Sequence, residues 1–197
     1  MPRLLHALAK SFARPACCRN VHVQAIIPSP HDVFISHRGP DTRRNIAGLL
    51  YDNLLRLGLR PFLDYRNMKV GDKLYEKIDT VIPYCKVGVV VFSPRYCESL
   101  YCLHELALLM ECQKRVIPIF YNVEPSQLRV GINKYNGTCV PAEKLERFER
   151  ALEETKDILG LRFDSSRGYW SEFLQNACDA ITEQIAQINN ESKYKLD

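Results

Sequence analysis

The sequence predicts an α/β domain with a parallel five-stranded sheet and helices on both of its faces. From residue 31 onward, short apolar segments alternate with amphipathic segments, which is the pattern of strands separated by helices. The segment from Val87 to Phe92 (VGVVVF) is apolar at every position, as expected of a central strand that is buried on both faces. The chain has 197 residues, of which 46% are hydrophobic, so it can build one core of ordinary size.

The first half of the chain supplies two strands and two helices before this central strand. We expect a strand from His31 to Ser36, a turn at residues 38–42, a helix from Arg43 to Arg56, a strand from Leu59 to Leu63, a charged loop at residues 64–72 and a helix from Lys73 to Ile82. Asp41 or Thr42 can cap the first helix, and Gly58 ends it.

The second half continues the alternation after the central strand. We expect a helix from Leu100 to Cys112, a strand from Val116 to Tyr121, a loop region at residues 126–141, a charged helix from Ala142 to Leu159, a short strand from Leu161 to Phe163 and an amphipathic helix from Tyr169 to Ile188. Residues 191–197 form a polar tail that we expect to fray.

Residues 1–30 differ from the rest because they carry four basic side chains and no acidic one. We expect a disordered extension that ends at the Pro28-Ser29-Pro30 segment. The alternatives are an organellar transit peptide and acylation of the Cys17-Cys18 pair. We expect a cytoplasmic protein, or an organellar one if this segment acts in targeting.

Composition argues against several classes of function. The net charge of +4 arises from 27 basic and 23 acidic residues, which does not by itself call for nucleic acid. No apolar run approaches the roughly 20 residues of a membrane-spanning helix. The eight cysteines form no C-x2-C pair, so we predict no metal site and expect reduced thiols. In a parallel sheet a ligand lies beyond the carboxyl ends of the strands, here the loops after Ser36, Leu63, Ser93 and Tyr121.

Four ordered motifs then point to one family. They are DVFISHRGPDTR at residues 32–43, FLDYRNMKVGD at 62–72, FSPRYCESLYCLHEL at 92–106 and VIPIFYNVEPSQLR at 116–129. Together they resemble plant Toll/interleukin-1 receptor (TIR) domains, which implies a flavodoxin-like fold over residues 31–190. The sequence has no phosphate-binding G-x-x-x-x-G-K-[ST] loop and little length outside the motifs, which predicts a TIR-only protein.

The resemblance implies an NAD glycohydrolase of plant innate immune and cell-death signalling. Such an enzyme cleaves NAD to nicotinamide and to ADP-ribose or cyclic ADP-ribose-type products. Glu105 matches the family's catalytic glutamate, and a carboxylate there can stabilise an oxocarbenium-like ribose. We expect this side chain to lie outside the core, since Leu103 and Leu106 face inward. No cofactor is implied, because NAD is the substrate, and NADP is a second candidate substrate.

The candidate binding residues gather in three of the motifs. They are Ser36, His37, Arg38, Gly39, Asp41, Thr42 and Arg43 after the first strand, Lys69 and Gly71 in the family's BB loop, and Tyr101 beside Glu105. Arginine binds pyrophosphate oxygens in a bidentate manner, glycine permits close backbone approach, and an aromatic ring can stack on a ligand. The alternative interpretations are a turn with a helix cap, a solvated charged loop and a helix-start aromatic. The family usually has phenylalanine at position 37, glutamate at position 40 and tryptophan at position 101.

The resemblance also implies self-association through TIR–TIR contacts, as a dimer or tetramer, and association with other TIR proteins. In the family the BB loop contacts a neighbouring protomer, and a Ser-His pair on the first helix mediates a second contact. Gly48 and Leu49 stand at that pair here. The main alternative function is therefore a non-catalytic TIR adaptor. Nucleic-acid hydrolysis, cyclic nucleotide synthesis and flavodoxin-type redox chemistry are further alternatives that the fold or family permits.

Overall fold

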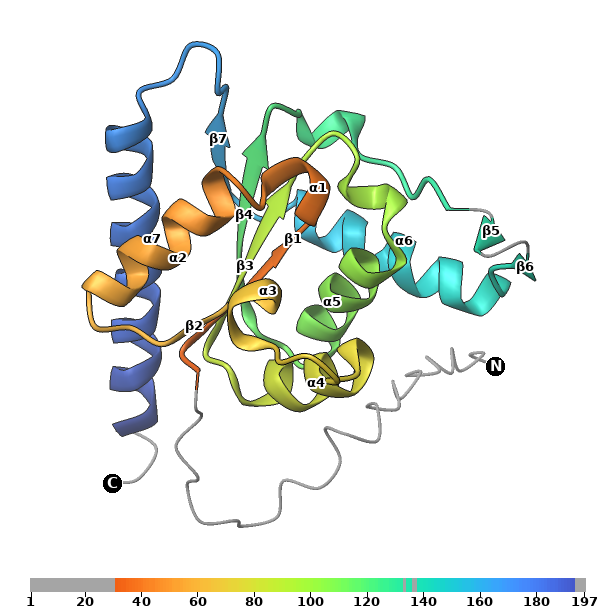
Figure 1. Ribbon diagram of the computed structural model, residues 1–197, viewed down its shortest axis with the longest axis horizontal. Coiled ribbons are helices and arrows are strands. Elements are labelled where there is room, and N and C mark those ends of the chain that lie inside the picture. The colour runs from red at the N-terminus through yellow and green to blue at the C-terminus, as the bar shows by residue number, and fades with distance from the viewer. Residues whose placement is uncertain (1–30, 133, 136–137, 194–197) are drawn as a thin grey trace, which may run out of the picture.

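The computed structural model describes residues 31–132, 134–135 and 138–193, and it has the expected parallel sheet (Figure 1). The sheet order is β2-β1-β3-β4-β7, and every neighbouring pair is parallel. The strands are β1 (Val33–His37), β2 (Pro61–Phe62), β3 (Val87–Phe92), β4 (Arg115–Tyr121) and β7 (Leu161–Phe163). The five-stranded α/β fold predicted from the sequence is thus confirmed. The chain connects β1 to β2 on one side and then crosses to β3 on the other, so β1 and β3 flank the point where the strand order reverses.

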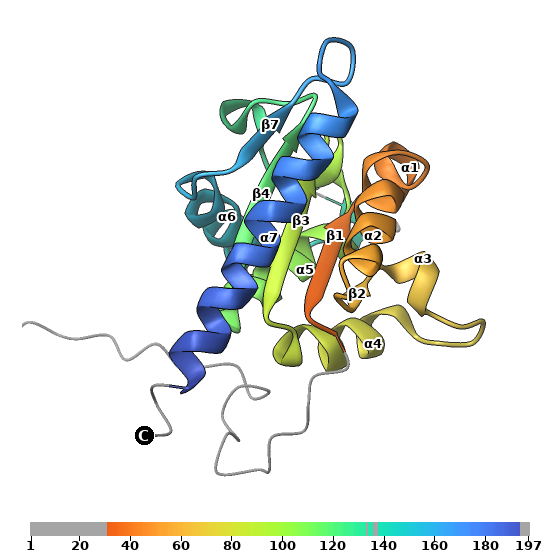
Figure 2. The same ribbon diagram turned by 90° about the vertical axis from the view of Figure 1, so that its left-hand side faces the viewer.

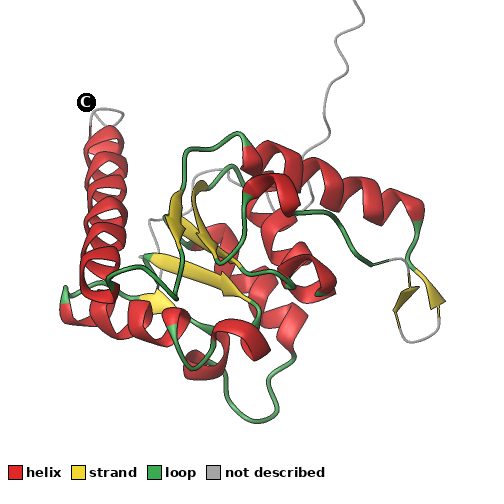
Figure 3. Cartoon of the chain, turned by 90° about the horizontal axis from the view of Figure 1, so that it is seen from above, coloured by secondary structure: helices red, strands yellow, loops and turns green. Residues whose placement is uncertain are grey.

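Helices cover both faces of the sheet, as the views from the side and from above show (Figure 2, Figure 3). One face packs on α2 (Ile46–Arg56) and α7 (Trp170–Lys193), which contact each other. The other face packs on α4 (Leu74–Val81), α5 (Leu100–Glu111) and α6 (Ala142–Lys156). Gly88 of β3 lets the Leu109 side chain of α5 approach, because a Cβ there would lie 2.6 Å from it. Among the described residues, no helix is long and apolar enough to span a membrane.

The helix expected from Arg43 begins at Ile46, and the expected turn before it is itself a short helix. A short helix α1 (Gly39–Thr42) ends before Asn45, whose side chain accepts a hydrogen bond from the Ile46 amide and caps α2. The prediction that Asp41 or Thr42 caps this helix was therefore wrong. Both side chains are used in contacts with residues of the pocket described below, and an asparagine three to four residues later takes the capping role.

Smaller elements fill the segments expected to be loops. The charged loop contains α3 (Asp64–Asn67), and 3-10 turns lie at η2 (Ile82–Tyr84), η3 (Tyr96–Glu98) and η4 (Pro125–Gln127). The region between β4 and α6 contains the antiparallel pair β5 (Lys134–Tyr135) and β6 (Thr138–Cys139), which lies away from the main sheet (Figure 1).

The last helix is longer than expected, because part of the predicted tail is helical. Arg115 of β4 donates hydrogen bonds to Gln184, Gln187 and Glu191, three side chains along one face of α7. These contacts hold the helix to the sheet beyond Ile188, and α7 ends at Lys193. Residues 191–193 of the expected tail are helical, while residues 194–197 and the predicted extension at 1–30 lie outside the described part of the chain.

Candidate active site

A pocket of about 320 Å³ opens at the carboxyl ends of β1 and β3, where the strand order reverses. The end of β1 and the α1 region contribute His37, Arg38, Gly39, Pro40 and Arg43. Helix α5 and the residues before it contribute Glu98, Ser99, Leu100, Tyr101, Cys102 and Glu105, while Asp64 and Leu74 come from the starts of α3 and α4. The pocket therefore unites three of the four sequence motifs.

Glu105 lies in this pocket but not on the surface. Glu105 is only 7% exposed, so the prediction that its side chain lies outside the core was wrong. Helix α5 packs against the sheet on one side and against α4 and α6 on others, and its buried residues therefore lie on most of its circumference. A periodicity argument that assigns one apolar face to a helix fails for a helix surrounded in this way.

Two hydroxyl groups connect Glu105 to the protein interior. Ser36 Oγ lies 2.6 Å from Glu105 Oε2 and 2.7 Å from the Tyr96 hydroxyl, and that hydroxyl donates to the Cys102 carbonyl oxygen at 2.9 Å. The Ser36 hydroxyl donates to Glu105, and either hydroxyl of the Ser36–Tyr96 pair can be the donor between them. This chain of contacts fixes the Glu105 carboxyl group against the end of β1.

Burial favours the neutral acid at Glu105. Burial raises the pKa of Glu105 from 4.5 to about 8, the Ser36 contact opposes this rise, and the negative charge of Asp64 adds to it. Asp64 behaves in the opposite way. Burial opposes its ionisation, but the hydrogen bond and the charge of His37 outweigh burial and lower the pKa of Asp64. One pocket thus holds two carboxyl groups whose pKa values are pushed apart, which is typical of sites with acid–base or charge-stabilising functions.

The Arg38 side chain is held at the pocket by acidic neighbours. Its Nη1 donates to Asp41 at 3.1 Å, and its Nη2 lies 3.7 Å from Glu98. Asp41 also accepts from Ser93 at 2.7 Å and from Arg95 at 2.6 Å, so it joins the ends of β1 and β3. Arg38 Nε is buried and has no hydrogen-bond partner in the described structure. An unsatisfied guanidinium N–H at a pocket is a donor available to an anionic ligand.

The Tyr101 ring lines the pocket and packs against other rings outside it. The rings of Tyr101 and Tyr75 lie 4.7 Å apart, and Tyr75 also packs edge-on against His104. His104 in turn contacts Asp79 at 2.8 Å and Arg147 at 3.2 Å, which joins α4, α5 and α6. Tyr101 is thereby held in place from behind by residues that are distant in sequence.

The structure brings together most of the predicted site residues, but not all of them. His37, Arg38, Gly39, Arg43, Tyr101 and Glu105 line the pocket. Ser36, Asp41 and Thr42 stand behind it and contact lining residues. Lys69 and Gly71 are exposed and do not line it, since the loop that carries them extends past α3.

Sequence reasoning missed Asp64, Tyr96 and Tyr75. Asp64 had a usable signal, because it directly follows the second strand and so belongs at the ligand-binding edge of a parallel sheet. Tyr96 is fully buried, and its role depends on Ser36, which is 60 residues away in the chain. Nothing in the local sequence indicates that contact.

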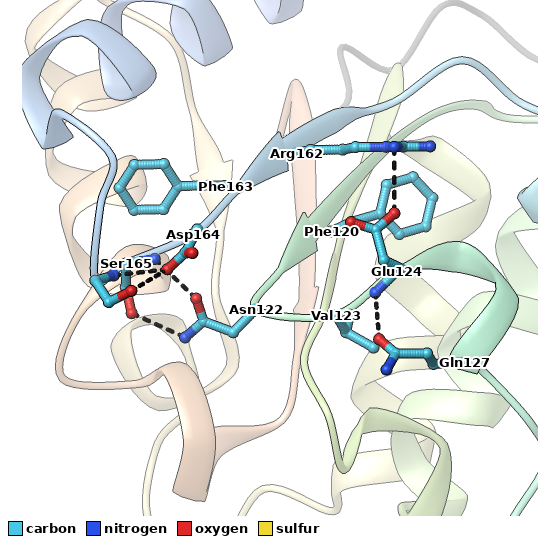
Figure 4. Close-up of a pocket in the computed structure, with 10 residues that line it drawn as sticks. Phe120, Asn122, Val123, Glu124, Gln127, Arg162, Phe163, Asp164 and Ser165 are labelled. Atoms are coloured by element: carbon cyan, nitrogen blue, oxygen red, sulfur yellow. Dashed lines mark hydrogen bonds and ion pairs between the residues drawn. The ribbon is translucent and has the colours of Figure 1, made fainter.

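A larger hollow of about 600 Å³ lies between the segments that follow β4 and β7 (Figure 4). Its polar side chains mostly pair with one another, as in the ion pair of Arg162 with Glu124 at 3.2 Å and the hydrogen bond from Asn122 to Ser165 at 2.8 Å. Size alone does not identify a site, and this hollow lacks the buried carboxyl group of the smaller pocket.

Comparison with known proteins agrees with this architecture. The chain is 46% identical over 160 residues to "Probable 2' cyclic ADP-D-ribose synthase BdTIR" of Brachypodium distachyon, covering 81% of this chain and 71% of that protein. It is 40% identical over 171 residues to "TMV resistance protein N" of Nicotiana glutinosa, covering 81% of this chain but only 15% of that longer protein.

A solved structure supports the same relationship. The TIR domains in "Structure of the activated Roq1 resistosome directly recognizing the pathogen effector XopQ" match with a TM-score of 0.64 and 29% identity, over 77% of this chain and 99% of that one. Residues 30–195 match the family described as TIR domain. The chain therefore belongs to the TIR domain family.

Proposed function

We propose that this protein cleaves the bond between nicotinamide and ribose in NAD, with Glu105 as the catalytic carboxylate. The observation that carries the proposal is the buried Glu105 carboxyl group in a pocket at the switch point of the sheet. The similarity to a relative named as a probable 2' cyclic ADP-D-ribose synthase supports it, because making a cyclic ADP-ribose from NAD requires cleavage of this bond.

The reaction needs little from the protein beyond charge stabilisation. When the C–N bond breaks, both electrons stay with nicotinamide, which leaves as a neutral molecule, and positive charge develops on the ribose. An ionised Glu105 stabilises this oxocarbenium-like ribose, as carboxylates do in glycoside hydrolysis. Water then gives ADP-ribose and a proton, or a nucleophile within the same ADP-ribose gives a cyclic product and a proton.

Ionisation of Glu105 is the energetic condition of this mechanism. Burial favours the neutral acid, since it raises the pKa of Glu105 to about 8. The oxidised nicotinamide ring carries a positive charge, so its arrival favours release of the Glu105 proton. Substrate binding thereby converts a resting acid into the carboxylate that the transition state needs.

Assembly belongs to the same proposal. We infer self-association, with NAD as the substrate and NADP as a second candidate, in plant immune and cell-death signalling in the cytoplasm. The structure explains why position 48 is glycine. A Cβ there would lie 2.9 Å from the Tyr65 hydroxyl, which donates to the Arg43 carbonyl oxygen. Leu49 is 41% exposed beside it, so it offers an apolar side chain to a contact through this part of α2. Lys69 and Gly71 then act through neighbouring protomers rather than within one pocket.

NAD consumption by the purified chain tests the proposal. Wild type should release nicotinamide, and Glu105→Gln should not, while Glu111→Gln on the same helix should keep activity, because Glu111 pairs with Arg147 outside the pocket. Rates that rise more than linearly with protein concentration would support an assembled active form. No turnover by wild type, with assembly confirmed by light scattering, would reject the enzyme and favour the adaptor.

A further inference from the structure

His37 is held by hydrogen bonds from two different elements. Its Nδ1 lies 2.9 Å from Thr42 Oγ1 on α1, and its Nε2 lies 3.1 Å from Asp64 Oδ1 on α3. The Thr42 hydroxyl donates its one proton to the Arg38 carbonyl oxygen at 3.0 Å, which can only accept. The Asp64 carboxylate can only accept, so His37 Nε2 donates to it.

This arrangement leaves one oxygen of Asp64 without a protein donor. In the described structure, both hydrogen bonds to the Asp64 carboxylate, from His37 and from the Tyr65 amide at 2.6 Å, end on Oδ1. Asp64 also lines the pocket that contains Glu105, and its negative charge reaches Glu105. A carboxylate with one oxygen fixed and the other at a pocket is a preorganised acceptor for a ligand donor.

The groups around Asp64 indicate which kind of ligand its free oxygen can accept a hydrogen bond from. Arg43, which follows α1, acts on Asp64 and packs over the Tyr65 ring, and Glu105 of α5 lines the same pocket. Carboxylates at the carboxyl edge of a parallel sheet accept hydrogen bonds from ribose hydroxyls of dinucleotides. The nearest ribose to Glu105, under the proposed function, is the one whose bond to nicotinamide breaks.

We propose that Asp64 binds the nicotinamide ribose of the substrate through Oδ2, accepting a hydrogen bond from a ribose hydroxyl, and that His37 is the positioning residue that orients it. This inference rests on the proposed NAD cleavage and adds a substrate contact to it. Phenylalanine, which the resemblance gives for position 37, cannot donate to Asp64. This chain therefore fixes the carboxylate by a hydrogen bond that such a residue cannot provide.

A cycle of variants and substrate analogues tests the contact. Kinetics are measured for wild type and Asp64→Asn with NAD and with analogues that lack the 2'- or the 3'-hydroxyl of the nicotinamide ribose. Removal of the contacted hydroxyl should lower kcat/KM at least about fivefold more in wild type than in Asp64→Asn, since hydrogen bonds to charged groups are strong. The intrinsic effect of the missing hydroxyl on bond cleavage cancels in this comparison. Equal losses in both proteins for both analogues would overturn the assignment of Asp64.

The role of His37 has its own test in the same cycle. His37→Gln can still donate from its amide to Asp64 and should retain most of the coupling, whereas His37→Phe should lose it. Equal coupling in His37→Phe and wild type, with both folded by circular dichroism, would overturn the positioning role. If wild type does not cleave NAD, the proposed function fails separately, and the cycle is then measured as dissociation constants for NAD and its analogues.

Discussion

Replacement of Glu105 by glutamine should change the pH dependence of stability as well as activity. The glutamine amide oxygen can accept from Ser36 Oγ as Glu105 does, so it preserves the chain to Tyr96 and the Cys102 carbonyl oxygen. It differs from glutamate in one respect that matters here, because it cannot ionise. The variant therefore isolates the cost of holding an ionisable group in this buried position.

The magnitude follows from the pKa of the folded and unfolded states. The pKa of Glu105 is 4.5 when unperturbed and about 8 in the folded protein, where burial raises it. The folded protein thus binds more protons than the unfolded chain between these values, and its stability falls as pH rises through this window. At about 1.4 kcal/mol per pKa unit, wild type should lose up to about 5 kcal/mol that Glu105→Gln keeps. Above about pH 8 the difference should become constant.

The assay is urea unfolding of both proteins at a series of pH values from 5 to 9. Trp170 is the single tryptophan and packs on Phe163, so its fluorescence reports loss of tertiary structure. The difference in unfolding free energy between the two proteins cancels all other titrating groups. The exposed Glu172→Gln serves as the matched control and should show no such trend. A difference between wild type and Glu105→Gln that stays flat from pH 5 to 8 would refute the reasoning about burial.

Three further outcomes follow from the same site. The kcat/KM for NAD should rise with pH up to about 8 and level off above it, because ionised Glu105 is the active form and burial raises its pKa; initial rates across this range measure it. Glu105→Ala should unfold more easily than Glu105→Gln at pH 6, by roughly 2–4 kcal/mol in urea, since it leaves a cavity and removes the partner of Ser36. Gly71→Ala should lower NAD turnover, since Gly71 has a φ of +100° that strains alanine and shifts this exposed loop; Gly131→Ala, where a Cβ meets only ordinary contacts, is the control, and equal activity of the two variants would contradict the role of the loop.

The strands could be predicted from local sequence, because the apolar pattern within each segment reflects how the strand is buried. Val87–Phe92 is apolar at every position since both faces of the central strand are covered, and the structure has a strand at the same residues. Element ends were less predictable. The start of α2 at Ile46 depends on the cap from Asn45, and the end of α7 depends on Arg115, which lies 69 or more residues away from its partners on that helix.

The sequence by itself determined the fold class and the edge of the sheet where a ligand belongs, and its resemblance to TIR domains singled out Glu105 as the candidate carboxylate. Tertiary structure alone decided that Glu105 is buried, that it contacts Ser36 across 69 residues, and that Asp64 joins it in one pocket. The physical reason is that strand and helix patterns are local, whereas desolvation and hydrogen bonding depend on what packs against a side chain from elsewhere in the chain. The pKa of Glu105, and with it the proposed chemistry, is a property of the packed pocket.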